Sequence, residues 1–250
     1  MKKPVISIIT IVYNGIDTLQ KTIDSITLQD YGNIEYIIID GGSNDGTVAL
    51  IKINSSVVSK WISEPDDGLY DAMNKGVRMA TGDYLWFINS GDEIYEKTTV
   101  SEMVNGFSSA WPDVIYGDTV MIDEQGNEIG ERRLQPPTQL SSTDFKNGML
   151  VSHQSILVST KIAQEYNTKY RFSADFEWCL QALRAANDVY NANQTLSRFL
   201  DGGLTKQNII PGLRERFDIM RRYFGIISTI WHHMPIAFRF VRYVLKNKRF

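Results

Sequence analysis

The sequence predicts an α/β protein with a doubly wound, mainly parallel sheet, a smaller α+β half that shares this sheet, and helices at the C-terminal end. Short apolar runs alternate with helical patterns over residues 5–89, and this alternation is typical of β-α-β units with parallel strands. After about residue 112 the pattern changes to extended segments and a hairpin. Acidic residues directly follow several of the apolar runs, and in such sheets ligands bind at the carboxyl ends of the strands.

The first half is expected to hold four strands separated by three helices. The run from Tyr36 to Ile39 is apolar throughout, which is typical of a strand that is covered on both faces. Gly41 and Gly42 then allow a tight turn before the next helix. The expected strands cover residues 5–12, 34–40, 58–63 and 84–89, and the expected helices cover residues 16–28, a segment from about 46, and 69–80.

The second half is expected to be a smaller α+β unit that is closed by helices. Gln125-Gly126-Asn127 lies between two extended runs and predicts a hairpin over residues 121–132, with Arg132 and Arg133 at its solvated end. Further strands are expected at 114–116, 155–158 and 189–199, a helix at 176–186, and two helical segments at the end of the chain.

The composition is that of an ordinary globular protein. The chain has 250 residues, of which 43% are hydrophobic and 22% charged, enough for one large or two small domains. The single cysteine, Cys179, excludes an intramolecular disulfide and a cysteine metal cluster, and we expect it in the core. We recognise no signal peptide and no apolar stretch of about 18 residues, the length that a membrane span needs.

The net charge of −3 is unevenly distributed. Residues 206–250 carry ten Lys or Arg and two Asp or Glu, a net +8, whereas residues 1–205 carry sixteen and twenty-seven, a net −11. Four basic residues of the tail recur at spacings of three and four, as on one stripe of a helix: Arg239, Arg242, Lys246 and Arg249. The tail is therefore either a basic amphipathic helix on an anionic membrane surface or a terminal helix that packs on the domain with a solvated basic face.

The chemistry is expected where the strands end. Neither GxGxxG nor GxxxxGK[ST] follows the first strand, which argues against a dinucleotide-binding fold of the usual form and against a P-loop enzyme. Carboxylates instead close the buried strands: Asp40, Glu64 with Asp66 and Asp67, and Asp92. Several converging acids repel one another unless a cation or hydrogen-bond donors lie between them, and hard oxygen ligands suit Mg²⁺ or Mn²⁺.

Five strings of the sequence resemble one enzyme family. They are SIITIVYN (7–14), IIIDGGSNDGT (37–47), SEPDDGLYDAMNKG (63–76), GDYLWFINSGDE (82–93) and YGD (116–118). In this order and spacing they resemble family 2 glycosyltransferases with the GT-A fold, over residues 4–205. The resemblance implies transfer of a sugar, with inversion, from a nucleoside-diphosphate sugar to an acceptor hydroxyl, assisted by Mg²⁺ or Mn²⁺.

The resemblance and the charge pattern together divide the chain into three parts. Residues 1–112 would be the nucleotide-sugar-binding half, residues 113–205 the acceptor-side half of the same GT-A domain, and residues 206–250 basic amphipathic C-terminal helices. Thr10 and Tyr13 would line a nucleobase pocket. The other donor contacts implied are Asp40 at the base or ribose, and Asn14, Asp66, Asp71, Asn74, Lys75 and Gly91 around the remainder of the donor.

Asp92 would bind the metal, and through it the diphosphate, as the remaining carboxylate of a DxD-type motif. The family often has two acids in this motif and two in the second-strand motif, where this chain has Gly91-Asp92 and Asp40-Gly41. Metal binding would then depend on a single side chain. The donor base stays open among UDP-, GDP- and dTDP-linked sugars.

Asp175, in FSADFEW, occupies the place of the family's catalytic base. An inverting transfer needs one base within hydrogen-bond reach of the acceptor hydroxyl. From the residues alone, Ser173-Ala174-Asp175 before an apolar run also indicates a helix N-cap, and both roles can hold. For His153, beside Gln154, a contact with phosphate or acceptor and a purely structural role stay open.

We therefore expect an inverting, metal-assisted glycosyltransferase that acts on a glycan or a lipid-linked acceptor. The expected location is cytoplasmic or peripheral at the inner membrane face. An anionic membrane surface is an expected partner and nucleic acid is not, because the acidic body would repel phosphates. A non-catalytic sugar-nucleotide-binding module and a nucleotidyltransferase are the alternatives. A nucleotidyltransferase is expected to carry a Gly- and Lys-rich phosphate loop after the first strand, and residues 13–17 are not such a loop.

Overall fold

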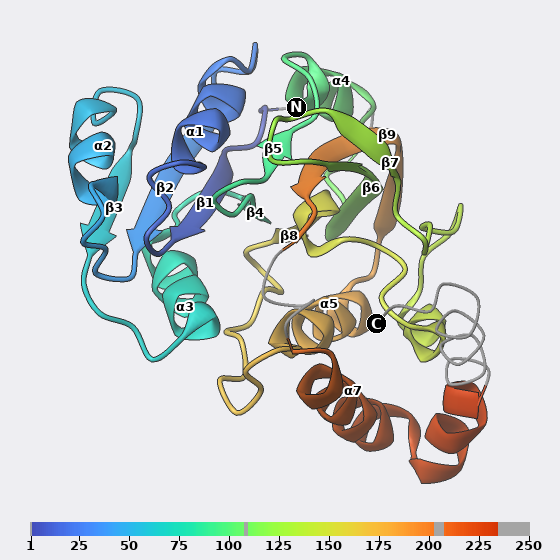
Figure 1. The fold of residues 1–250 in the computed structure, drawn as a ribbon. Coiled ribbons are helices and arrows are strands. Elements are labelled where there is room, and N and C mark those ends of the chain that lie inside the picture. The colour runs from blue at the N-terminus through green and yellow to red at the C-terminus, as the bar shows by residue number, and fades with distance from the viewer. Residues whose placement is uncertain (1, 108–109, 203–207, 235–250) are drawn as a thin grey trace.

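The computed structural model describes residues 2–107, 110–202 and 208–234 (Figure 1). Strands and helices alternate through the first half of the chain and become irregular in the second. The elements are β1 (Ile6–Val12), α1 (Leu19–Thr27), β2 (Ile34–Asp40), α2 (Thr47–Ile53), β3 (Lys60–Ser63), α3 (Leu69–Met79), β4 (Tyr84–Phe87), β5 (Glu93–Ile94), α4 (Thr99–Asn105), β6 (Val114–Ile122), β7 (Glu128–Glu131), the 3-10 turns η1 (Ser142–Asn147) and η2 (His153–Ser155), β8 (Ile156–Ser159), α5 (Ala174–Ala185), β9 (Val189–Leu200) and α7 (Ile209–Phe224).

One sheet connects both halves of the described chain, in the order β3-β2-β1-β4-β8-β6-β9-β5, with β7 paired to β6. The first four strands of this order are parallel, and β1 lies between β2 and β4. Beyond β4 the sheet is mixed: β8 runs antiparallel to β4 and to β6, and β9 runs parallel to β6. The α/β fold class is confirmed, and the run of four neighbouring parallel strands lies in the half in which helices separate the strands.

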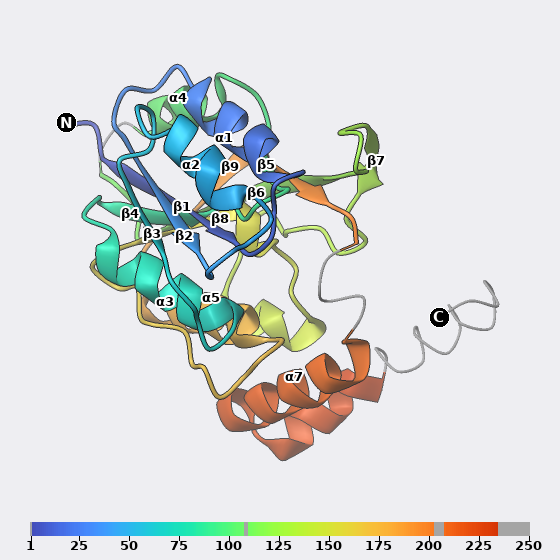
Figure 2. The same cartoon turned by 60° about the vertical axis from the view of Figure 1, so that its left-hand side comes forward.

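Helices cover both faces of the sheet (Figures 1 and 2). On β1, Ile9 and Ile11 join the apolar cluster with α3 and α5, whereas Ile6, Ile8 and Val12 join the cluster with α1, α2 and α4. Successive residues of a strand point to opposite faces, so a strand between two helical layers is apolar on both sides. The continuous apolar runs of β1, β2 and β4 follow from this three-layer arrangement.

Several elements differ from the expectation. The helix α1 starts at Leu19 rather than at residue 16, and α4 and β5 were not expected. The strand β6 continues to Ile122 instead of ending at Tyr116, because it pairs with β9 along most of its length. The hairpin between β6 and β7 is confirmed, and Cys179 is buried in the core as expected. The division of the chain at residue 112 stays a prediction.

The C-terminal helices begin with α7, which packs on α5 at the end of the molecule opposite α1 and α4 (Figure 2). Backbone N–H groups of Arg171 and Phe172 donate to the Glu215 carboxylate, both at 2.9 Å. Packing on the domain is thus confirmed for α7. The stripe Arg239 to Arg249 lies outside the described residues. No described helix is both long and apolar enough to cross a membrane.

Candidate active site

The loops after β1 and β2 are joined at the carboxyl edge of the parallel strands. The Asn14 N–H donates to Ser43 Oγ at 2.7 Å, and the Asn44 N–H donates to Asn14 Oδ1 at 3.0 Å. Asn14 adopts a left-handed backbone with φ of 48°, which asparagine tolerates better than most residues. Tyr13 is 66% exposed beside it. Two of the expected donor contacts therefore lie on an accessible, ordered edge of the sheet.

Asp40 and Thr10 are placed differently from the expectation. Asp40 is fully buried, and its carboxylate accepts hydrogen bonds from Ser63 Oγ at 2.6 Å and from backbone N–H groups of residues 42 and 43. Thr10 is also fully buried, and its hydroxyl donates to the Ile88 carbonyl at 2.7 Å. Both side chains hold strands and turns together, so neither meets a nucleobase as placed. Side-chain polarity at a strand end does not reveal which face the side chain takes.

A second acidic group borders the end of β2. A Cβ atom at Gly41 would overlap Asp66 Oδ2, so only glycine lets this carboxylate lie against the strand end. Asp66 Oδ1 accepts the Gly68 N–H at 2.9 Å, which turns the chain into α3. Lys75, on α3, contacts Asp71 at 3.6 Å and Glu64 at 3.0 Å. The lysine therefore partly offsets an acidic patch, as the repulsion between converging carboxylates requires.

Asn74 faces the interior instead of the donor side. Its amide forms a reciprocal pair with the backbone of Tyr166, since Nδ2 donates to the carbonyl at 2.9 Å and Oδ1 accepts the N–H at 2.6 Å. Asn74 is 5% exposed. It fixes the loop before α5 to α3, and a donor contact would require this clamp to open.

The turn after β4 holds Gly91 and Asp92. Gly91 has φ of +97°, and a Cβ atom there would lie 2.7 Å from Leu200 Cδ2. Asp92 is 4% exposed, and its carboxylate accepts Gln154 Nε2 at 2.9 Å and the Leu200 N–H at 3.1 Å. Burial raises the pKa of Asp92 to about 7, although these hydrogen bonds act in the opposite direction. The turn is therefore tied to β9 and to η2.

The same turn offers oxygen atoms that fit a hard cation. Asn89 Oδ1, three residues before Asp92, is buried and has no hydrogen-bond partner among the described residues. Mg²⁺ and Mn²⁺ sites often use one or two carboxylates together with substrate phosphates and water, so the lack of a cluster of three His, Cys, Asp or Glu in the described part of the chain does not oppose such a site. Coordination by Asp92 would require its carboxylate to share or release the hydrogen bond from Gln154 or Leu200.

His153 lies in an aromatic cluster in the interior. Its ring stacks on Phe87 at 5.1 Å and packs edge-on against Trp178 at 5.5 Å, and Nε2 is 2.6 Å from the Tyr166 hydroxyl. Burial lowers the pKa of His153 to about 4, with Asp175 acting in the opposite direction. The imidazole is thus neutral near pH 7. The structural role fits this placement, and a direct contact with phosphate or acceptor does not.

Asp175 lies in the first turn of α5, one residue inside the helix that Ser173 precedes as N-cap. Asp175 is therefore not the cap. Its Oδ1 accepts the Tyr70 hydroxyl at 3.0 Å and the Phe176 N–H at 2.9 Å. Among the described residues no hydrogen bond reaches Oδ2, and the residue is only half-buried. One carboxylate oxygen is held in place while the other can accept a proton from a ligand.

Two side chains near Asp175 were not predicted as part of the site. Tyr70, which belongs to the string DGLYD at residues 67–71, positions the carboxylate. Arg132 was expected at a solvated hairpin end. It is instead partly buried, and its guanidinium donates to the carbonyls of Met149 and Leu150 at 3.3 and 3.4 Å. Burial and the Arg216 cation lower the pKa of Arg132 to about 10, with Asp175 acting in the opposite direction.

The sequence matches a known family and named relatives. A family model described as Glycosyl transferase family 2 matches residues 7–167. An uncharacterised glycosyltransferase of Mycobacterium tuberculosis is 33% identical over 230 residues, which cover 88% of this chain and 86% of the relative. A PGL/p-HBAD biosynthesis glycosyltransferase of Mycobacterium bovis is 31% identical over 185 residues, covering 71% of this chain and 69% of the relative.

Two solved structures share the fold at low sequence identity. TarS 1-349 of S. aureus in complex with UDP-GlcNAc superposes with a TM-score of 0.68 at 15% identity, covering 87% of this chain and 64% of that one. The mannosyltransferase PcManGT of Pyrobaculum calidifontis, in complex with GDP-Man and Mn²⁺, superposes with a TM-score of 0.64 at 12% identity, covering 100% and 77%. This chain belongs to glycosyltransferase family 2 and is a glycosyltransferase with the GT-A fold.

Proposed function

We propose that the protein transfers a sugar, with inversion, from a nucleoside-diphosphate sugar to a hydroxyl group of a glycan or lipid-linked acceptor, with Asp175 as the base. The observation that carries this proposal is the asymmetry of the Asp175 carboxylate, with Oδ1 fixed by Tyr70 and Phe176 and Oδ2 open. A general base must have a free lone pair directed at the acceptor hydroxyl. Oδ2 takes the proton of that hydroxyl as its oxygen attacks the anomeric carbon from the side opposite the leaving diphosphate.

The donor side is proposed at the joined loops after the parallel strands. The side chains proposed to contact the donor lie on these loops or on the first turns of α3, and they are Tyr13, Asn14, Asp66, Asp71 and Lys75. The tyrosine ring can stack on a base, and the carboxylates can accept hydrogen bonds from sugar hydroxyls. The solved neighbours TarS and PcManGT are complexes with UDP-GlcNAc and GDP-Man, which supports a nucleotide-sugar at this edge. Thr10, Asp40 and Asn74 shape the loops from within.

Mg²⁺ or Mn²⁺ is proposed at Asp92, with Asn89 Oδ1 as a neighbouring oxygen donor. When bound, the cation would neutralise negative charge that develops on the leaving diphosphate. The protein's own contribution is to hold the turn: Thr22 Oγ1 accepts the Gly91 N–H at 3.0 Å and donates to the Asp92 carbonyl at 2.8 Å. A cytoplasmic location, peripheral at the membrane, completes the proposal, and nucleic acid is not a proposed partner.

The test is a nucleotide-release assay with the full chain, Mn²⁺ and a panel of UDP-, GDP- and dTDP-sugars. We expect slow hydrolysis of one donor, and a fall of about 10²- to 10⁴-fold for Asp175→Asn, the range that general base catalysis provides. Asp188→Asn, a matched change of an exposed aspartate, is expected to leave release unchanged. Asp92→Asn is expected to remove the stimulation by Mn²⁺.

Donor binding by calorimetry separates the alternatives. If Asp175→Asn binds and hydrolyses the donor as well as wild type does, Asp175 is not the base. Donor binding without turnover for any acceptor, unaffected by Asp175→Asn, would indicate a non-catalytic sugar-nucleotide-binding module. Release of pyrophosphate from a nucleoside triphosphate would indicate a nucleotidyltransferase.

A further inference from the structure

A second helix follows α7 and turns its apolar residues outward. Residues 226–234 are helical and begin directly after Gly225, whose φ of +80° ends α7. On this helix the exposed fractions are 83% for Ile227, 50% for Ile230, 71% for Trp231 and 62% for Met234. These residues, which we call the outer stripe, have the spacing of one helix face. A surface helix normally buries such a face against its own core, and this one does the reverse.

The polar side of the same helix faces the protein. Thr229 is fully buried, and its hydroxyl donates to the Gly225 carbonyl at 2.8 Å. The His233 ring packs edge-on against Phe217 of α7, with centroids 5.1 Å apart. The orientation of the helix is therefore fixed by contacts on its polar side. These contacts hold the outer stripe on the solvent-facing side of the helix.

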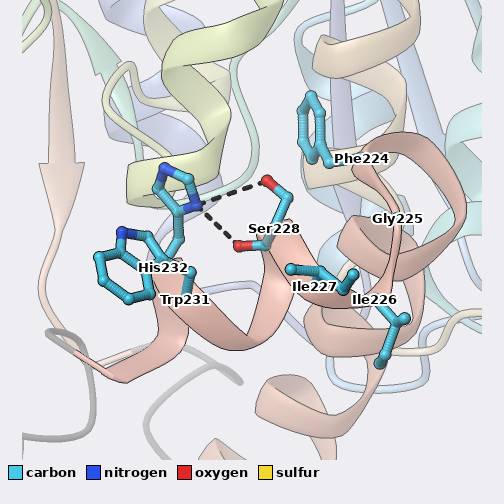
Figure 3. A pocket seen from close by; sticks show the side chains of 7 residues that line it. All are labelled: Phe224, Gly225, Ile226, Ile227, Ser228, Trp231 and His232. Atoms are coloured by element: carbon cyan, nitrogen blue, oxygen red, sulfur yellow. Dashed lines mark hydrogen bonds between the residues drawn. The ribbon is translucent and has the colours of Figure 1, made fainter.

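Figure 3 shows a groove at the start of this helix, which shares Ile227 and Trp231 with the outer stripe. Phe224, Ile226, Ile227 and Trp231 line it together with Ser228 and His232. The His232 Nδ1 atom lies 2.7 Å from the Ser228 carbonyl, as the dashed line in Figure 3 shows, so the imidazole is turned back along its own helix. Most of the side chains in this groove are apolar.

The helix pair is fastened to the proposed active site. The Tyr170 hydroxyl donates to Asp218 of α7 at 2.8 Å, and Ser173 Oγ donates to the Gly212 carbonyl at 3.1 Å. Ser173 is the N-cap of α5, two residues before Asp175. Whatever the outer stripe binds is therefore held at a fixed place relative to Asp175.

The charge around the stripe selects the occupant. Arg214 of α7 is exposed, Arg221 is exposed but pairs with Asp218 at 2.7 Å, and residues 235–250 of the sequence add five Lys or Arg and no acid. A second copy of the chain would carry the same excess of positive charge over residues 206–250, and like charges across an interface are unfavourable. An anionic bilayer offers the opposite charge together with an apolar layer, and tryptophan prefers that boundary.

We propose that the outer stripe, Ile227, Ile230, Trp231 and Met234, inserts into the interfacial layer of an anionic phospholipid bilayer and docks the enzyme there. This inference names a surface and a partner independently of the sugar transfer proposed above. It assigns the docking to a structured helix, with the basic residues that follow adding attraction to anionic headgroups.

The test measures co-sedimentation of the full chain with phosphatidylcholine vesicles, with and without phosphatidylglycerol. We expect binding to the mixed vesicles that weakens as salt rises. Ile227→Asp is expected to reduce partitioning by about tenfold or more, which corresponds to ~1.4 kcal/mol. Ile53→Asp is the matched control, because Ile53 is 78% exposed at the end of α2, and it is expected to leave binding unchanged. Because Ile227 is exposed, the variant is expected to fold, which circular dichroism checks.

Quenching of tryptophan emission by brominated lipid provides a second readout. We expect quenching in the wild type that Trp231→Phe abolishes. Absence of binding to both vesicle types, or an equal loss in Ile53→Asp, would overturn the proposal. A concentration-dependent dimer that Ile227→Asp dissociates, without vesicle binding, would assign the stripe to a second copy instead. A large loss of folding stability in Ile227→Asp would indicate that the chain itself covers the stripe, and would also overturn the proposal.

Discussion

Tyr70→Phe is expected to lower turnover, because it removes the hydroxyl group that donates a hydrogen bond to the Asp175 carboxylate. The Tyr70 ring is buried and stacks on Tyr166 with centroids 5.7 Å apart, and phenylalanine preserves this packing. The lost interaction is the hydrogen bond of 3.0 Å from the Tyr70 hydroxyl to Asp175 Oδ1. Since the Phe176 N–H still holds the same oxygen at 2.9 Å, the carboxylate keeps part of its orientation.

The size of the effect follows from the kind of bond. A hydrogen bond to a charged group contributes about 1.5–3 kcal/mol, and each 1.36 kcal/mol of transition-state stabilisation is about tenfold in rate. With the second donor retained, we expect the lower part of this range, a fall of about ten- to thirtyfold in kcat. The KM for the donor should change by less than about twofold, because the interaction belongs to the transition state rather than to donor binding.

The assay is donor turnover at saturating and limiting donor concentrations. The matched control is Tyr31→Phe, which deletes the same atom from a buried tyrosine whose hydroxyl donates to the Pro4 carbonyl at 2.6 Å. A kcat for Tyr70→Phe equal to that of the control, or an effect confined to KM, would show that Tyr70 does not position the base.

Three further predictions test the placement of side chains at the site. Gly41→Ala should raise the KM for the donor severalfold, because the added methyl group displaces the Asp66 carboxylate that lies against this glycine. In the control Gly32→Ala the methyl group meets no neighbour, so donor titrations should give an unchanged KM. Asn74→Ala should lower the free energy of unfolding by about 2–4 kcal/mol, since it leaves the N–H and carbonyl of Tyr166 without partners, and an unchanged denaturation midpoint would contradict the clamp. In the unfolded chain His153 takes up a proton near pH 6.5. In the folded protein the buried His153, with its pKa of about 4, takes up this proton only near pH 4. As the pH falls from about 6.5 to about 4, the free energy of unfolding should therefore decrease by about 1.36 kcal/mol per pH unit, or about 3 kcal/mol in total. Urea titrations of His153→Phe should lack this slope. A slope identical to that of wild type would show that the histidine does not cause it.

The parallel half of the fold could be predicted because its information is local. Runs such as Tyr36 to Ile39 are apolar on both faces, and glycines or acids mark where the strands end. The second half was harder to predict, since β6 obtains its length from pairing with β9, about 75 residues later in the sequence. Long-range pairing of this kind leaves little trace in the periodicity of either segment.

The family, the succession of strands and helices in the parallel half, and the acidic residues that close these strands could all be inferred from the sequence. Which of these polar side chains face outward depends on how the chain folds around them. Asp40 and Asn74 carry polar groups that backbone N–H and C=O groups satisfy from within, whereas Tyr13 and one oxygen of Asp175 stay accessible. The same holds for the helix of residues 226–234, where the buried Thr229 and the packing of His233 on Phe217 turn the apolar stripe away from the core. Sequence periodicity gives the spacing of a face, but its direction depends on what the rest of the chain packs against it.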